Sequence, residues 1–420
     1  MDISLQILLL VALLILLARG LGDLSARLGF PIVLGELLAG VVAGPSLLNV
    51  LHWSWFSAPA SVAGAPISVA AALKVLADLG VVVLMFLAGL ETDVVLMRRT
   101  VGPAISAACG GVVLPLVIGS AVARGAGLGW PEAVFVGTVL TATSVSITAQ
   151  TLMNLGELRS TAGSTILGAA VIDDILGLVV LSFVIALEPR SHSAAGSGWA
   201  GIGMTLARMA AFFLVAVGLG PRVVKWSFHR AKKLAGQHVV LGVALALAFF
   251  FAFLADALGG MAAITGAYLA GILVGFTPAQ DEVLREVRSL SHSFLGPLFF
   301  VSIGLEIDAW ALGGNWVFFL ALLLVAVGGK VLGCGLGAWL GRMSSRDSLI
   351  VGIGMVPRGE VGLITATIGW TSGLISPQVF SLAVVLVLIT TLLTPIMLRI
   401  PFRQSKLAES SPAEAALPEY

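Results

Sequence analysis

Long apolar segments recur from one end of the chain to the other, separated by short polar connections. A helix of about 20 apolar residues can cross the ~30 Å hydrocarbon core of a bilayer. The pattern predicts thirteen membrane-spanning helices, at 4–27, 31–45, 68–91, 101–124, 131–154, 161–187, 199–226, 237–257, 259–276, 289–306, 311–341, 346–371 and 376–400. An all-α polytopic membrane protein is therefore expected.

Composition leaves little room for a soluble domain. Hydrophobic residues make up 58% of the 420 residues and charged residues 11%, against roughly 25% charged residues in soluble domains; the mean hydropathy is +1.07. The two cysteines, Cys109 and Cys334, lie in apolar segments, so neither a disulfide nor a cysteine metal site is expected. The net charge of +1 gives no reason to expect a nucleic-acid partner, and no cofactor is expected.

Basic residues test the count of helices. With thirteen spans, the odd-numbered connections and the C-terminal tail lie on one side of the membrane, and they hold seventeen of the 23 Lys and Arg residues. The even-numbered connections, on the opposite side, hold only Arg124 and Arg190. By the positive-inside rule, the N-terminus lies outside and the C-terminus in the cytoplasm. The opening MDISLQ lacks a basic region, so no cleaved signal peptide is expected.

Two short motifs recur in the same order. GELLAGVVAG at 35–44 matches GAYLAGILVG at 266–275, and GLETD at 89–93 matches GLEID at 304–308. The matches predict two six-helix repeats, the first six and last six spans, joined by the seventh. Because seven spans separate equivalent helices, the repeats are inverted. Inverted repeats are typical of secondary transporters, with the site where broken helices meet at the membrane midplane.

The fifth and twelfth spans are the candidates for such broken helices. The fifth has a hydroxyl cluster that includes Thr143 and Ser144, and the twelfth contains the sequence VPRGEVGLI. Pro357 removes a helical hydrogen bond, and the adjacent glycines weaken the helix. Arg358 and Glu360 flank the proposed break, and we expect them to pair with each other or with helix ends rather than to contact a transported ion.

Asp173 and Asp174 lie near the middle of the sixth span, where an ionised residue costs about 2.5–3.5 kcal/mol on insertion scales. Adjacent helical residues point about 100° apart, so the two can have different neighbours. Lys330 in the eleventh span is the natural partner for one of them. Burial disfavours the charged form of the other carboxyl group, which could then exchange a proton near neutral pH or bind a small cation through hard oxygen ligands.

The motifs TATS at 141–144, IDD at 172–174 and VPRGEVGLI at 356–364, together with Lys330, resemble the NapA-type sodium/proton antiporters of the monovalent cation:proton antiporter-2 family. The resemblance covers residues 1–400. It implies that Asp174 binds the cation and the proton, and that Asp173 pairs with Lys330 and is a second Na⁺ or Li⁺ ligand in the same ion-binding and proton-carrying site. Thr143 and Ser144 would complete that site from an unwound segment.

The resemblance also implies a domain organisation. A mobile core would comprise spans near 101–187 and 311–400, and a dimerisation domain spans near 1–91 and 237–306, with a linker helix near 199–226 and a short tail at 401–420. The double aspartate resembles the electrogenic branch, which implies two protons per cation. Lipid, Na⁺ or Li⁺, H⁺ and a second copy of the chain are the implied partners. A bacterial inner-membrane protein acting in pH homeostasis is expected.

Three alternatives stay open. The first is a K⁺/H⁺ antiporter or a Kef-type K⁺ efflux system, although Kef-type relatives have a Gln-Asp pair and a nucleotide-binding domain. The second is an intramembrane aspartyl protease, because GLGD at 20–23 matches its G-x-G-D motif; Asp23, however, lies between Arg19 and Arg27 at the edge of a span. The third is a channel, which would require polar residues along a continuous pore.

Overall fold

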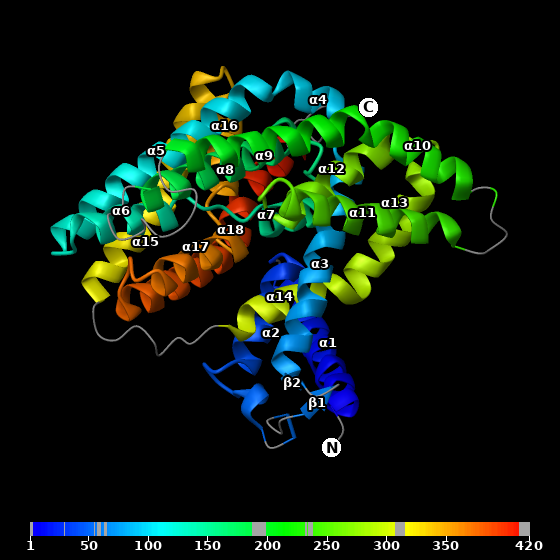
Figure 1. Cartoon of the computed structure of the whole chain (residues 1–420), viewed down its shortest axis with the longest axis horizontal. Helices are drawn as coiled ribbons and strands as arrows, with labels where there is room; N and C mark the ends of the chain where they lie inside the picture. Colours follow the sequence, from blue (N-terminus) through cyan, green and yellow to red (C-terminus); the bar gives the residue numbers. More distant parts are fainter. Residues whose placement is uncertain are drawn as a thin grey trace, which may run out of the picture.

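The computed structural model describes residues 3–28, 30–53, 55–56, 60–62, 65–186, 199–231, 233, 238–306 and 316–410. In these residues the fold is almost entirely helical (Figure 1). The first half contains α1 (Ile3–Arg27), α2 (Ile32–Ala43), η1 (Val50–His52), β1 (Ala60–Val62), β2 (Ala65–Ile67), α3 (Val69–Glu91), α4 (Val94–Arg99), α5 (Val101–Gly125), α6 (Trp130–Val139), α7 (Val145–Leu155) and α8 (Thr161–Ala186). The second half contains α9 (Trp199–Gly218), α10 (Gly220–Ala231), α11 (Val239–Ala257), α12 (Ala263–Gly275), α13 (Gln280–Leu290), η3 (Ser291–Leu295), α14 (Gly296–Leu305), α15 (Trp316–Leu340), α16 (Ser345–Gly354), α17 (Glu360–Thr371) and α18 (Pro377–Ser410).

Seven of the described helices are long and apolar enough to cross a membrane: α1, α3, α5, α8, α11, α15 and α18. An eighth is obtained if α9 and α10, which are bent by 44° relative to each other, form one span. The helices α2 and α12, which carry the two recurring glycine-rich motifs, are apolar but shorter. The structure therefore confirms a polytopic helical membrane protein.

Three local features differ from the sequence expectation. A two-stranded antiparallel hairpin, β1–β2, forms between α2 and α3, with Ser61 opposite Pro66. The expected helix at 289–306 is instead preceded by the amphipathic α13 and begins with η3, a π-helical turn. The last helix, α18, continues to Ser410, beyond the expected end at 400. A search for long apolar runs detects none of these, because the hairpin is short, α13 is polar on one face and α18 ends in a polar segment.

Glycines allow three helix pairs to approach closely. A Cβ atom on Gly40 of α2 would lie 2.6 Å from the Cα of Gly304 of α14. A Cβ on Gly89 of α3 would lie 3.0 Å from the Cα of Gly271 of α12. Side chains at these positions would force the helices apart, so the glycines permit backbone-to-backbone packing of the kind common in membranes.

The third close pair is α5 and α15, which bring segments more than 200 residues apart in the chain side by side. In Figure 1, α5, α6 and α15 lie at one end of the molecule and α10, α11 and α13 at the other. Between them, α12 packs on α3, α3 on α7 and α7 on α8, and all four helices contribute residues to one pocket.

Candidate functional site

The fifth and twelfth expected spans are each broken into two half-helices. The first break separates α6 from α7 at 140–144, and the second separates α16 from α17 at 355–359. The breaks touch: the Ser144 amide donates to the Pro357 carbonyl at 2.8 Å, and the Thr143 hydroxyl donates to the Met355 carbonyl at 3.5 Å. Backbone groups that lack helical partners at one break thus form hydrogen bonds with groups of the other break. Irregular backbone inside a membrane needs such partners, because lipid offers none.

Arg358 is fully buried at this crossing. Its guanidinium donates to the Leu140 carbonyl at 2.6 Å and to the Val356 carbonyl at 2.9 Å. These carbonyls lie just beyond the C-termini of α6 and α16, where helix dipoles carry partial negative charge. Arg358 thus contacts the two helix ends, and its role in supporting the crossing stays a prediction. The Glu360 side chain lies outside the described residues, although its backbone begins α17.

Asp173 and Lys330 form a buried ion pair. The Lys330 ammonium on α15 donates to Asp173 Oδ1 on α8 at 2.9 Å, and the two side chains are 0% and 2% exposed. A single unpaired charge at this depth would be strongly destabilising, whereas the pair cancels both charges. The pairing expected from the sequence is present, and its role in transport stays a prediction.

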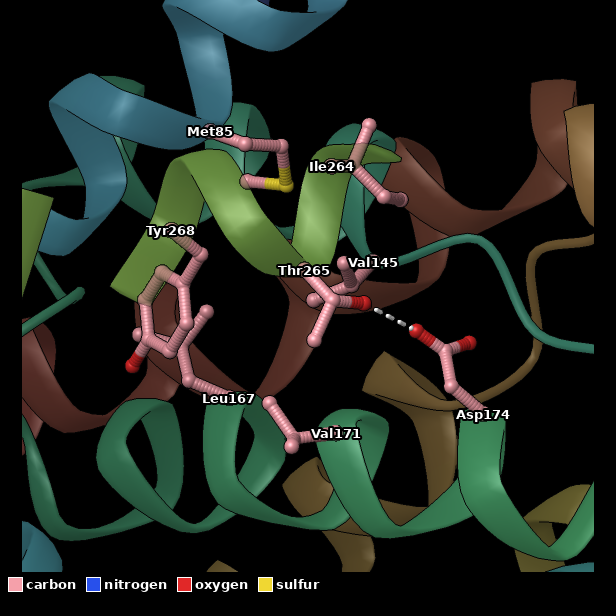
Figure 2. A pocket seen from close by; sticks show the side chains of 8 residues that line it. All are labelled: Met85, Val145, Leu167, Val171, Asp174, Ile264, Thr265 and Tyr268. Atoms are coloured by element: carbon pink, nitrogen blue, oxygen red, sulfur yellow. Dashed lines mark hydrogen bonds between the residues drawn. The ribbon is translucent and has the colours of Figure 1, made fainter. Parts of the chain in front are cut away.

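Asp174 has a different partner from its neighbour. The Thr265 hydroxyl on α12 donates to Asp174 Oδ2 at 2.9 Å, and the side chains face each other across the gap between α12 and α8 (Figure 2). The pocket around them has a volume of about 10 Å³, roughly the room that one water molecule needs. Apolar side chains line the rest of it: Met85, Val145, Leu167, Val171, Ile264 and the ring of Tyr268.

The pocket joins the carboxylate to the broken helix. Val145 lines the pocket and directly follows Ser144, so Asp174 lies beside the first turn of α7. Sequence reasoning did not single out Thr265, which brings a hydroxyl to this carboxylate from a helix remote in the chain. A hydroxyl one position before the glycine-rich GAYLAG motif was the signal that could have pointed to it.

Asp23, the aspartate of the protease alternative, lies elsewhere. Its carboxylate pairs with the Arg27 guanidinium at 2.7 Å, one helical turn away on α1, and the side chains are 60% and 76% exposed respectively. This is a solvated ion pair at a helix end rather than a buried catalytic group. The geometry gives the protease alternative no support.

Comparisons with known proteins identify the family of this chain. A sequence model of the family described as "Sodium/hydrogen exchanger, transmembrane" matches residues 9–404. The chain is 36% identical to the Na⁺/H⁺-K⁺ antiporter GerN of Bacillus cereus, over 93% of this chain and 95% of the relative. It is 34% identical to a Na⁺/H⁺ antiporter of Enterococcus hirae, over 92% of this chain and 96% of the relative.

The fold is also similar to a solved structure. The sodium proton antiporter MjNhaP1 from Methanocaldococcus jannaschii superposes with a TM-score of 0.66, covering 94% of this chain and 96% of that one at 17% sequence identity. At 17% identity the superposition supports only the fold, and the assignment to a family rests on the sequence matches. The chain therefore belongs to the transmembrane sodium/hydrogen exchanger family, a family of membrane transporters rather than enzymes.

Proposed function

We propose that this protein is a secondary active antiporter that exchanges protons for Na⁺ or Li⁺ by alternating access. The observation that carries the proposal is the different pairing of two adjacent carboxylates. Lys330 neutralises Asp173, whereas Asp174 meets a neutral hydroxyl in a small pocket beside two broken helices. Relatives named as Na⁺/H⁺ antiporters at 30–36% identity support the same exchange.

Asp174 is the proposed carrier of both substrates. In one step its carboxylate binds a cation, with hydroxyl and backbone oxygens of the crossing, including those of Thr143 and Ser144, completing a shell of hard ligands. In the other step the same carboxylate binds a proton, and the cation is released. Because one negative charge cannot hold both tightly, each substrate displaces the other, which couples the two flows.

Arg358 and Pro357 support the crossing rather than the ion. The Arg358 guanidinium offsets the negative ends of α6 and α16, and Pro357 keeps α16 from continuing into α17. Both roles preserve the irregular backbone on which the oxygen ligands lie. Glu360 begins α17 and is assigned to the same support.

We infer that exchange is electrogenic, with two protons moved per cation. The buried ion pair supplies the second titrating group: Lys330 is protonated while paired with Asp173, and releases its proton when Asp173 turns to the arriving cation. Each cycle would then move one net positive charge.

We also infer thirteen spans in two inverted repeats. The close glycine contacts support the repeat, because Gly40 and Gly271 occupy equivalent motif positions, as do Gly89 and Gly304. The α2–α14 contact and the α3–α12 contact are then equivalent, because an internal two-fold axis relates one to the other. From the family resemblance we also propose the core, dimerisation and linker domains, a homodimer and an inner-membrane location. The distribution of basic residues is the basis for a cytoplasmic C-terminus.

The test is exchange by purified protein in liposomes. A pH gradient is established, and its dissipation is followed by a pH-sensitive dye after addition of Na⁺, Li⁺ or K⁺. We expect saturable dissipation with Na⁺ and Li⁺. Because GerN is named as exchanging K⁺ as well, activity with K⁺ would favour the K⁺/H⁺ alternative, and a current without proton coupling would favour a channel.

A further inference from the structure

A second polar cavity lies apart from the pocket of Asp174. It has a volume of about 260 Å³ and lies between α1, α2, α7 and the segment η3–α14. Its polar lining consists of Arg19, Glu36, Gln150, Asn154, Ser291 and His292. The transport steps described above use none of these side chains.

Oxygen atoms in this cavity lack partners. Gln150 is 4% exposed and Ser291 is 0% exposed, yet Gln150 Oε1 and Ser291 Oγ accept or donate no hydrogen bond. Buried polar groups of this kind are rare and costly, so each requires an explanation such as a bound ion or water. Both residues line the cavity, so a ligand held there would satisfy them.

Glu36 adds a negative charge to these oxygens. It is 5% exposed, and its Oε1 lies 3.9 Å from an Arg19 nitrogen, beyond hydrogen-bond distance. Arg19 is shared between two acceptors, because another of its nitrogens donates to the backbone carbonyl of His292. The buried carboxylate is therefore only loosely compensated and remains able to attract a further cation.

Local structure places these groups together. Ser291 and His292 lie in the π-helical turn η3, a type of irregularity often found at functional sites. The His292 ring contacts the Gln150 amide at 3.1 Å, which ties η3 to α7. Gln150 lies five residues after Val145 on α7, so the cavity is roughly 7.5 Å along that helix from the pocket of Asp174.

We propose that this cavity is a second monovalent-cation site, an antechamber that holds Na⁺, Li⁺ or K⁺ before it reaches Asp174. Glu36, Gln150 and Ser291 supply carboxylate, amide and hydroxyl oxygens, which are the ligands that hard cations prefer. The cavity is large enough for the ion to keep part of its water shell. Arg19 competes with the cation for Glu36 and so weakens the site. The proposal rests on the proposed exchange function.

Binding of ²²Na⁺ to purified protein tests the site directly. The background is D174N, in which the primary site is removed. We expect saturable residual binding in D174N, lost in D174N/E36Q and retained in D174N/E282Q, because Glu282 is exposed on α13 outside the cavity. Equal binding by all three variants, or none by any of them, would overturn the antechamber.

Exchange kinetics provide a second test, in which two variants should change the KM for Na⁺ in opposite directions. E36Q should raise the apparent KM for Na⁺ by about fivefold, the factor expected for one charge contact in a watery cavity, and should change kcat much less. R19Q removes the competing cation and should lower the KM. If the pair were merely structural, both variants would shift the KM in the same direction or leave it unchanged.

E36D is the control that separates loss of the charge from misfolding, because it keeps the carboxylate. We expect its KM to stay much closer to wild type than that of E36Q, and gel filtration in detergent checks that each variant is folded. Failure of the two proposals is distinguishable. A wild-type protein without proton-coupled exchange contradicts the proposed function, whereas normal exchange with an E36Q KM equal to wild type contradicts only the antechamber.

Discussion

Asp173 and Asp174 are neighbours on α8, but one faces an ammonium group and the other a hydroxyl. D174N keeps the shape of the side chain and removes its ability to lose a proton or to hold a cation by charge. We expect a folded protein whose exchange falls to the background of empty liposomes. D23N, at an exposed aspartate, is the matched control and should keep the wild-type rate. Wild-type dissipation of the pH gradient by D174N would contradict the assignment.

Lys330 should matter more for stability than Asp174. K330A leaves the Asp173 carboxylate buried without its partner, which costs about 3–5 kcal/mol. Thermal unfolding in detergent should therefore be lowered more by K330A than by D174N. The double variant D173N/K330A should be more stable than the sum of the single effects predicts, and strict additivity would show that the two groups are not coupled.

Thr265 connects α12 to the proposed ion carrier through a single hydroxyl. T265V removes the donor at nearly constant volume, and a hydrogen bond to the ionised carboxylate favours that form. We expect T265V to move the pH dependence of exchange toward more alkaline values and to raise the KM for Na⁺. T265S keeps the hydroxyl and should restore both parameters. A T265S variant that behaves like T265V would instead indicate a packing role for the methyl group.

At the scale of elements, close helix packing depends on particular glycines. A Cβ on Gly333 of α15 would overlap the backbone of Gly110 on α5, whereas Gly328 on the same helix has nothing within 4 Å. G333A should lower stability by about 1–3 kcal/mol through overpacking. G328A, the control, should be neutral or should stabilise by about 0.5–1 kcal/mol through helix propensity. Equal unfolding temperatures for the two variants would show that α5 and α15 can separate without cost.

At the scale of the whole molecule, the proposed two-for-one exchange moves charge across the membrane. Each net charge is worth about 2.3 kcal/mol per 100 mV, so a membrane potential should drive transport. We expect a transient current on a supported membrane after a Na⁺ jump, and a change in exchange rate when valinomycin and K⁺ set a potential. Strong exchange with neither effect would show that Asp173 and Lys330 serve structure alone.

Much of the architecture follows from local properties of the sequence. Long apolar runs can only be satisfied as membrane helices, because lipid offers no hydrogen bonds to the backbone. Pro357 and its flanking glycines predict a broken helix, since proline lacks the donor that a continuous helix needs, and α16 ends before it. A buried lysine and two buried aspartates predict an ion pair, because an unpaired charge at that depth is too costly, and Lys330 does pair with Asp173.

Contacts between distant helices were decided only by the tertiary structure. The apolar pattern left open which aspartate the lysine meets, and only the family resemblance implied Asp173. The pairing depends on how α8 is rotated against α15. Thr265 and Glu36 belong to helices whose apolar patterns predict only burial, so their positions beside Asp174 and Gln150 could not be read from periodicity. Local pattern determines which segments cross the membrane, whereas the rotation and depth of each helix depend on packing against partners far away in the chain.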